Sequence, residues 1–227
     1  MRKINAVQIA VFSVLFGLAI ASAAATTWLT VGRLPLGDLR GLALACAFAL
    51  LLYVFALLLY RLFLRLFPLR TGEVAPGSQQ EFVYHVYLLF FLILFYPVMR
   101  SGFVPVPLMR LFFQALGARM GENSYSAGII LDPIFVELGD NTLVGQYALL
   151  IPHVIEGERL AHYSIRIGSN VTIGAGATVM AGVTIADNAI VSTGAVVKKG
   201  SSIGAGEIWG GVPAKKIGIR SATTVVE

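Results

Sequence analysis

The sequence predicts an α-helical membrane domain followed by an all-β solenoid of stacked hexapeptide repeats. Two observations predict this division. Aliphatic residues return at every sixth position in the C-terminal half, as in "IGSNVTIGAGATVMAGVTIADNAIVSTGAVVKKG" at 167–200. The N-terminal half carries long apolar runs, which give the chain a hydrophobic content of 57% and a mean hydropathy of +0.80. An ordinary soluble domain is less apolar than this.

Three apolar runs in the N-terminal half have the length of membrane spans. They cover residues 5–29, 41–64 and 82–99, and each is near the ~20 residues that cross ~30 Å of hydrocarbon. The first run is long and other runs follow it, which disfavours a cleaved signal peptide. We therefore expect residues 1–119 to form a multi-pass, membrane-associated helical domain.

The basic residues that flank these runs leave two membrane arrangements open. Arginine or lysine clusters flank each run, and positively charged flanks favour the cytoplasmic side. All three clusters reach that side if residues 82–117 dip into the bilayer and return, with "SGFVPVPLM" as the bend, and we favour this arrangement. Three plain crossings would instead put the N-terminus and the solenoid on opposite sides. Residues 67–80 are interpreted as an exposed linker in both arrangements.

The period of six predicts a strand followed by a corner. An α-helix repeats its buried face about every 3.6 residues and a strand about every 2, so neither fits as a continuous element. Each unit then sends one aliphatic side chain inward, and Gly or Asn takes a positive φ at the corner. Three units close a triangular coil, and coils bury their apolar faces by stacking. The expected inward residues are Ile167, Ile173, Val179, Ile185, Val191, Val197 and Ile203.

The solenoid is expected to span residues 120–219, because the same phase extends upstream through Val144, Leu138, Asp132, Ser126 and Met120. Residues 220–227 are then a C-terminal tail. The phase fails between Leu150 and Ile167, which predicts an inserted loop at 151–166. Insertions in solenoids project from one face and collect binding groups, so this loop is the first place to expect chemistry.

Charge and cysteine content exclude two classes of function. The net charge of +5 comes mostly from cations at the membrane flanks, where anionic headgroups attract each of them by ~1 kcal/mol. Nucleic acid is therefore not an expected partner. The single cysteine, Cys46, lies in the second apolar run and is interpreted as a packing residue. One cysteine supplies neither a disulfide framework nor a cysteine-ligated metal site, and we expect no metal.

Hexad repeats, an insertion that carries histidine, and the closing segment "GEIWGGVPAKKIG" together resemble the hexapeptide-repeat acyltransferases. The resemblance is to the galactoside, maltose and serine O-acetyltransferases and their exopolysaccharide-modifying relatives, and it covers residues 120–219. It implies a left-handed parallel β-helix, acetyl-CoA as the acyl donor, and a homotrimer with the donor groove between subunits. In that family a catalytic histidine precedes the final coils, in a segment similar to "HVIEGER" followed by "IGSNV". The matching residue is His153.

The resemblance implies that His153 is a general base, because an alcohol is too weakly acidic to ionise alone at neutral pH. Two carboxylates could hold its second ring nitrogen, namely the inward-phased Asp132 and Glu156 on the same loop. Glu156 could also bind the acceptor or lie in solvent. His162 shares the insertion without a motif match, and we expect it on the surface. His85 is expected at the headgroup level of the membrane.

Acetyl-CoA requires cations for its phosphates and small residues beside its pantetheine arm. The expected cations are Lys198, Lys199, Lys215 and Lys216. The expected wall of the groove consists of Ala177, Gly194 and Ala195.

The sequence thus predicts a membrane-anchored O-acyltransferase that moves an acetyl or short acyl group from CoA to a hydroxyl. A soluble sugar would not require so large an anchor, so we expect a lipid-linked saccharide or another amphiphile as acceptor. The expected location is a bacterial-type inner membrane, with the catalytic domain in the cytoplasm. Two alternatives stay open: a non-catalytic trimeric membrane scaffold, and a γ-carbonic-anhydrase-like enzyme, which would need three histidines around one metal.

Overall fold

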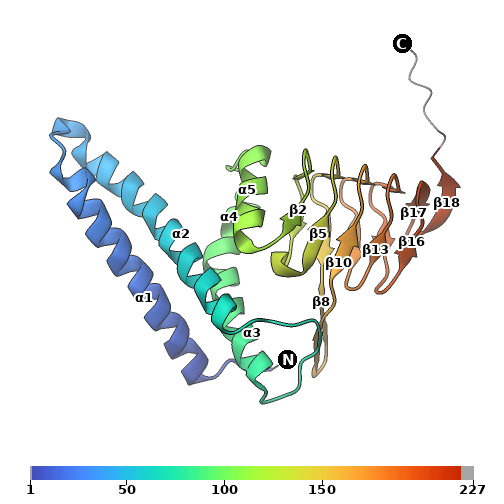
Figure 1. Cartoon of the computed structure of the whole chain (residues 1–227), viewed down its shortest axis with the longest axis horizontal. Helices are drawn as coiled ribbons and strands as arrows, with labels where there is room; N and C mark the ends of the chain where they lie inside the picture. Colours follow the sequence, from blue (N-terminus) through green and yellow to red (C-terminus); the bar gives the residue numbers. More distant parts are fainter. Residues whose placement is uncertain (1, 221–227) are drawn as a thin grey trace, which may run out of the picture. The chain divides into compact units, whose positions relative to one another are not determined.

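The computed structural model describes residues 2–220, which form two compact units (Figure 1). The helical unit consists of residues 2–69 and 75–97. The β-helix unit contains residues 70–74 and the chain from 98 onward. Apart from Arg220, the predicted tail at 220–227 lies outside the described residues.

The first two helices of the helical unit have the length and composition of membrane spans. α1 (Ala6–Leu29) begins at a capping box, in which the side chains of Asn5 and Gln8 each accept the other's backbone N–H. The turns η1 (Val31–Arg33) and η2 (Gly37–Leu39) lead into α2 (Arg40–Leu66). Only 17% and 6% of their apolar windows are buried, which leaves far more apolar surface exposed than a fold in water tolerates. Both helices are therefore suited to a lipid environment.

The third span-length helix runs from 79 to 100 and is more deeply packed, with 56% of its apolar window buried. It consists of α3 (Gln79–Phe90), the π-helical η3 (Phe91–Phe95) and α4 (Tyr96–Arg100). The three predicted apolar runs are thus confirmed as helices.

Two side chains in the helical unit differ from their predicted roles. His85 is buried, and its Nδ1 lies 3.1 Å from the side-chain oxygen of Gln8, so it does not face the headgroups. Cys46 is exposed on α2 and is not a packing residue, because this helix buries few of its side chains.

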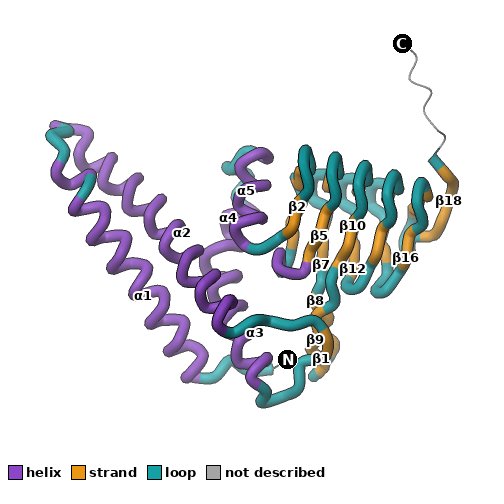
Figure 2. Tube along the Cα trace, viewed as in Figure 1, coloured by secondary structure: helices purple, strands orange, loops and turns teal. Residues whose placement is uncertain are grey.

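The β-helix is built from three sheets, one on each side of the coil, with parallel pairing between successive coils (Figure 2). The first sheet contains β2 (Arg119–Met120), β5 (Val136–Leu138), β10 (Ile165–Ile167), β13 (Thr184–Ile185) and β16 (Ser202–Ile203). The second contains β3 (Tyr125–Ser126), β6 (Leu143–Val144), β11 (Thr172–Ile173), β14 (Ile190–Val191), β17 (Glu207–Gly210) and the antiparallel β18 (Lys215–Ile219). The third contains β4 (Ile129–Ile130), β7 (Leu149–Ile151), β12 (Thr178–Met180) and β15 (Val196–Val197).

The predicted inward phase is confirmed along the whole solenoid. The inward residues from Met120 to Ile203 are at most 8% exposed. Asparagine takes a positive φ at one corner of successive coils, at Asn123, Asn141, Asn170 and Asn188. The fold class predicted from the sequence is therefore correct, while the hand of the coil stays a prediction from the resemblance.

The predicted insertion is a β-hairpin formed by β8 (His153–Glu156) and β9 (Arg159–His162). A third strand, β1 (Gly72–Glu73), pairs antiparallel with β9. This strand comes from the segment predicted as an exposed linker; Glu73 is exposed as predicted, but Val74 directly after it is buried. A strand of two residues carries too little periodicity to be recognised in a sequence.

Helix α5 (Val106–Leu116) caps the first coil of the β-helix. Its buried residues are Met109, Phe113 and Leu116, and Arg110 donates a 2.8 Å hydrogen bond to the carbonyl of Gly121. The prediction that residues 82–117 return through the bilayer is wrong for this second leg. Its apolar side chains cover the open end of the solenoid, where an unpaired coil would otherwise meet solvent.

Truncation of an inward residue should destabilise the solenoid through the cavity that it leaves. We expect Ile185→Ala to cost about 2–5 kcal/mol of unfolding free energy. The matched control is Thr184→Ala, whose side chain points outward on the same strand and should change stability by about 0.5 kcal/mol or less. Hydrogen exchange of the β-helix amides in the full chain measures both values. Equal effects of the two variants would contradict the inward assignment.

Candidate active site

The insertion brings a histidine and a carboxylate together at one end of two paired strands. His153 follows β7, and Asp132 follows β4, which pairs with β7 in parallel. The Nδ1 atom of His153 lies 2.5 Å from Oδ2 of Asp132. An ionised carboxylate only accepts hydrogen bonds, so Nδ1–H donates to it and Nε2 remains as the acceptor atom of the ring.

Asp132 sits at a position where a carboxylate requires a partner. Its φ is +45°, at the start of the 3-10 turn η4 (Pro133–Phe135), and its side chain is 4% exposed. Burying a charge without a partner is costly, and the His153 ring supplies the hydrogen bond. The His153 side chain is 24% exposed, so the pair has one buried member and one that solvent and ligands can reach.

Two opposing effects set the pKa of His153. Burial lowers the pKa, because the imidazolium loses hydration, but the hydrogen bond and the negative charge of Asp132 raise it. The contributions of Asp132 together prevail, and the pKa lies above the ordinary 6.5. A raised pKa makes the imidazole a stronger base.

His162 is a second histidine of this site, and the prediction of a surface position is wrong. The hairpin register places it opposite His153, where it is fully buried. Its ring stacks on Phe135, with centroids 5.0 Å apart. Burial lowers its pKa below 6.5; the charge of Asp132 raises the pKa and that of His153 lowers it further, so His162 is neutral at pH 7. Nothing in the sequence marked it, because its burial depends on the hairpin.

Glu156 does not reach His153, and the prediction that it orients the imidazole is wrong. It lies exposed on the hairpin and forms ion pairs with Arg159, at 3.1 Å, and with Lys199. Hydrogen bonds from Lys199 and Arg159 lower the pKa of its carboxyl. Successive side chains of a strand alternate between its faces, so residues 153 and 156 point to opposite faces.

The residues predicted for a donor groove separate into buried and exposed groups. Ala177 and Ala195 are fully buried inside the coil, so they cannot line a groove. They occupy the second inward position of their units, which Val171 and Val183 fill in other units. Gly194 is exposed at a corner with φ +69°, and no atom lies within 4 Å of where its Cβ would be. It remains a candidate for close approach of a ligand.

The predicted lysines all lie on the surface of the later coils and the closing hairpin. Lys199 is tied to the His153 hairpin through its ion pair with Glu156. Lys216 bonds to Glu207 at 2.7 Å, and that hydrogen bond is the main cause of a Glu207 pKa of about 2. Lys198 and Lys215 are exposed.

Residues 164–199 match the family described as "Bacterial transferase hexapeptide (six repeats)". These residues form a hexapeptide-repeat β-helix. The comparison with curated proteins gave no match.

Several solved structures resemble the chain. A hexapeptide-repeat-containing acetyltransferase from Vibrio cholerae is 21% identical, with a TM-score of 0.43 over 46% of this chain and 64% of that chain. Galactoside acetyltransferase in complex with coenzyme A is 28% identical, with a TM-score of 0.41 over 46% of this chain and 56% of that chain. The polySia-specific acetyltransferase NeuO is 21% identical, with a TM-score of 0.37 over 48% and 53%. The chain thus spans between 53% and 64% of the length of these structures.

The chain has three histidines, so their titration can be resolved by NMR. We expect His153 to titrate above pH 6.5 and His162 below it. Asp132→Asn should lower the pKa of His153, because it removes the charge while burial remains. Glu156→Gln, the matched control on the same hairpin, should leave that pKa in place. If Asp132→Asn leaves the pKa of His153 unchanged, the pairing of these two residues is contradicted.

Proposed function

We propose that the protein is a membrane-anchored acyltransferase that moves an acetyl or short acyl group from CoA to a hydroxyl. The observation that carries the proposal is the 2.5 Å contact between His153, on the insertion, and Asp132, on a coil of the hexapeptide-repeat β-helix. The solved acetyltransferases that resemble the chain include one in complex with coenzyme A. A partly exposed imidazole with one nitrogen fixed by a buried carboxylate is suited to general-base work.

In this mechanism His153 moves one proton twice. Nε2 accepts the proton of the acceptor hydroxyl as that oxygen attacks the thioester carbonyl carbon. The carbon–sulfur bond then breaks, and His153 returns the proton to the departing thiolate, so the products are an ester and a free thiol. Asp132 remains ionised throughout and stabilises the imidazolium that forms between the two transfers.

The transfer is proposed to be direct, without an acyl-enzyme. The single cysteine of the chain, Cys46, lies on the span-length helix α2, in the helical unit. A thiol in a membrane-spanning helix is not suited to act as the nucleophile. His153 therefore acts on the acceptor itself, and both substrates occupy the site at once.

The donor is proposed to bind along the later coils, beside Gly194 and the lysines at 198, 199 and 215. Lysine ammonium groups suit the phosphates of CoA, and a corner without a Cβ allows the pantetheine arm close to the backbone. A groove on one solenoid face is open on its other side. We therefore propose a homotrimer, in which a neighbouring subunit completes the groove.

The acceptor is proposed to be a lipid-linked saccharide or another amphiphile. Three helices long and apolar enough to cross a membrane precede the β-helix. An enzyme anchored in this way meets substrates that are themselves confined to the bilayer surface. Because CoA donors are cytoplasmic, we place the β-helix on the cytoplasmic side of a bacterial-type inner membrane.

Loss of the base should remove most of the activity while the fold remains. His153→Ala is expected to lower turnover by roughly 10²–10⁴-fold. Glu137→Gln, at an exposed position of the same β-helix, is the control, and its turnover should stay near that of the unaltered chain. Acyl transfer from acetyl-CoA by the purified full chain is the measurement. Near-normal turnover of His153→Ala would refute the base, and no turnover of the unaltered chain would favour the non-catalytic scaffold.

The shared groove predicts that activity depends on assembly. Native mass spectrometry of the full chain in mild detergent should show three subunits. Activity should fall as the subunits are separated by dilution or harsher detergent, because each groove loses one wall. A monomer with full activity would rule out a site shared between subunits.

A further inference from the structure

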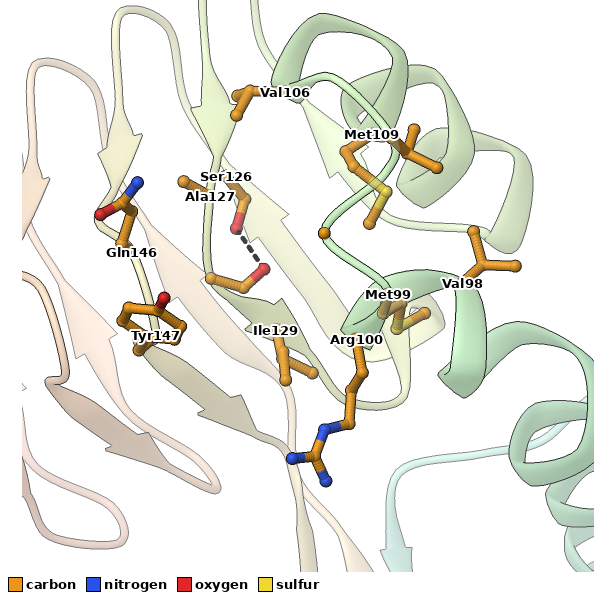
Figure 3. A pocket seen from close by; sticks show the side chains of 13 residues that line it. Val98, Met99, Arg100, Val106, Met109, Ser126, Ala127, Ile129, Gln146 and Tyr147 are labelled. Carbon is orange, nitrogen blue, oxygen red and sulfur yellow. Dashed lines mark hydrogen bonds between the residues drawn. The ribbon is translucent and has the colours of Figure 1, made fainter.

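A cavity of about 420 Å³ opens on the β-helix unit, between the segment 98–109 and the first coils (Figure 3). One wall is apolar and includes Met99 and Met109. The opposite wall comes from a coil corner and carries Gln146 and Tyr147. Arg100 also lines the cavity, and Figure 3 shows its side chain at the edge, below Met99 and Ile129. The cavity therefore combines an apolar side, a polar side and a cation.

The charge of the cavity favours an anion. Arg100 is the one charged residue among those that line it, and no carboxylate lines it. A guanidinium presents several N–H donors in a planar fork that matches the oxygens of a phosphate. A ligand that joins an anionic group to an apolar chain would thus find a cation for the first and an apolar wall for the second.

Tyr147 takes a backbone conformation that glycine adopts readily and aromatic residues rarely do. Its φ is +59°, and its side chain is 83% exposed. β7 pairs in register with β12, and β12 with β15, so the equivalent corners of the next coils are Gly176 and Gly194. A tyrosine where these coils have glycine is strained and exposed, which is the pattern of residues kept for a ligand. Its ring offers an apolar face and its hydroxyl a hydrogen bond.

The sequence position of the cavity gives the source of the ligand. Residues 98–100 end the apolar helix Gln79–Arg100, which is long enough to cross a membrane. An arginine at the end of such a helix lies at the level of the lipid phosphates. Phe103, directly after it, is 90% exposed, and Leu108 is 54% exposed. An apolar chain end and an anionic head are thus both suited to the segment that forms this wall of the cavity.

The cavity and the His153–Asp132 pair lie at opposite ends of the same two strands. Ile129 lines the cavity, and Asp132 follows it by three residues, at most about 10 Å away at ~3.3 Å per residue. On the neighbouring strand, Tyr147 and His153 are separated by up to about 20 Å on the same rise. A phosphate held by Arg100 would leave room for sugar units before a hydroxyl reaches Nε2 of His153.

We propose that this cavity binds the phosphate-bearing head of an amphiphilic acceptor. Arg100 holds the phosphate, the Met99 and Met109 side receives the first carbons of the lipid, and Gln146 with Tyr147 contacts the sugar. The assignment of the occupant as the acceptor rests on the acyltransferase function proposed above. The chemical class is a saccharide linked through phosphate to a long apolar chain.

Three probes separate the possible sources of the binding. The full chain in neutral detergent is titrated with farnesyl phosphate, with farnesol, and with inorganic phosphate, and occupancy is read by native mass spectrometry. We expect farnesyl phosphate to bind at least tenfold more tightly than either other probe. If farnesol binds equally well, the cavity recognises only the apolar chain. If inorganic phosphate binds equally well, the cavity recognises only the anion. Either result overturns the proposal.

Variants locate the binding. Arg100→Gln should weaken farnesyl phosphate binding at least tenfold, while Arg100→Lys should retain part of it. Tyr147→Asn keeps a residue that tolerates positive φ and should weaken binding of a glycosylated lipid phosphate. The control Arg119→Gln removes an arginine on the same unit, outside the cavity, and should bind normally. Unchanged binding by Arg100→Gln would overturn the site.

The failures of the two proposals are distinguishable. His153→Ala should bind farnesyl phosphate as tightly as the unaltered chain, because the cavity does not include that residue. If the chain binds this probe through Arg100 but transfers no acyl group, the function is wrong and the site stands. If it transfers acyl groups and Arg100→Gln changes neither binding nor the KM for a lipid-linked acceptor, the site is wrong and the function stands.

Discussion

Parallel pairing between coils at a fixed register is the constraint on which the rest of the β-helix depends. Ile167 pairs with Ile185, and Ile173 with Val191, so each inward side chain rests on its counterpart in the next coil. The register leaves no freedom for a slipped strand, because a shift by one residue would turn every apolar side chain outward. The residues that follow a strand in one coil therefore lie beside the residues that follow the paired strand in the next coil.

The candidate site is a direct consequence of that register. Ile130 pairs with Leu150, so the residues after these two strands meet at one corner. Asp132 occupies one of the inward positions, two residues after strand β4. After the paired strand β7 the chain leaves the coil and forms the hairpin that begins with His153. Exposed ion pairs of Arg159 with Glu73 and Glu156, together with the Glu156–Lys199 pair, connect this hairpin with strand β1 and with a coil corner. Each such pair contributes little stability alone, but the network restricts where the hairpin can lie.

The sequence predicted the features that depend on the hexad period. It did not predict the features that depend on pairing between segments far apart in the chain. The hexad phase predicts the inward position of Asp132, and the resemblance to the family segment "HVIEGER" points to His153, which lies where the phase fails. The prediction that Ala177 and Ala195 line the donor groove is wrong, because a small residue in a solenoid can fill the interior of the coil as well as allow a ligand close to the backbone. Strand β1 was missed because it pairs with residues far along the chain. The length of α5 gave no sign that its apolar face would meet a coil instead of lipid.

The two histidines of the hairpin show how one corner can separate two identical side chains by role. His153 is partly exposed and bonded to a carboxylate, which raises its pKa, whereas His162 is fully buried and its pKa falls. A second imidazolium beside the first would oppose protonation of His153 through like-charge repulsion. Because burial keeps His162 neutral, the negative charge of Asp132 acts on His153 without that competition. The basicity of His153 therefore depends on Asp132, although a second histidine lies opposite it on the hairpin.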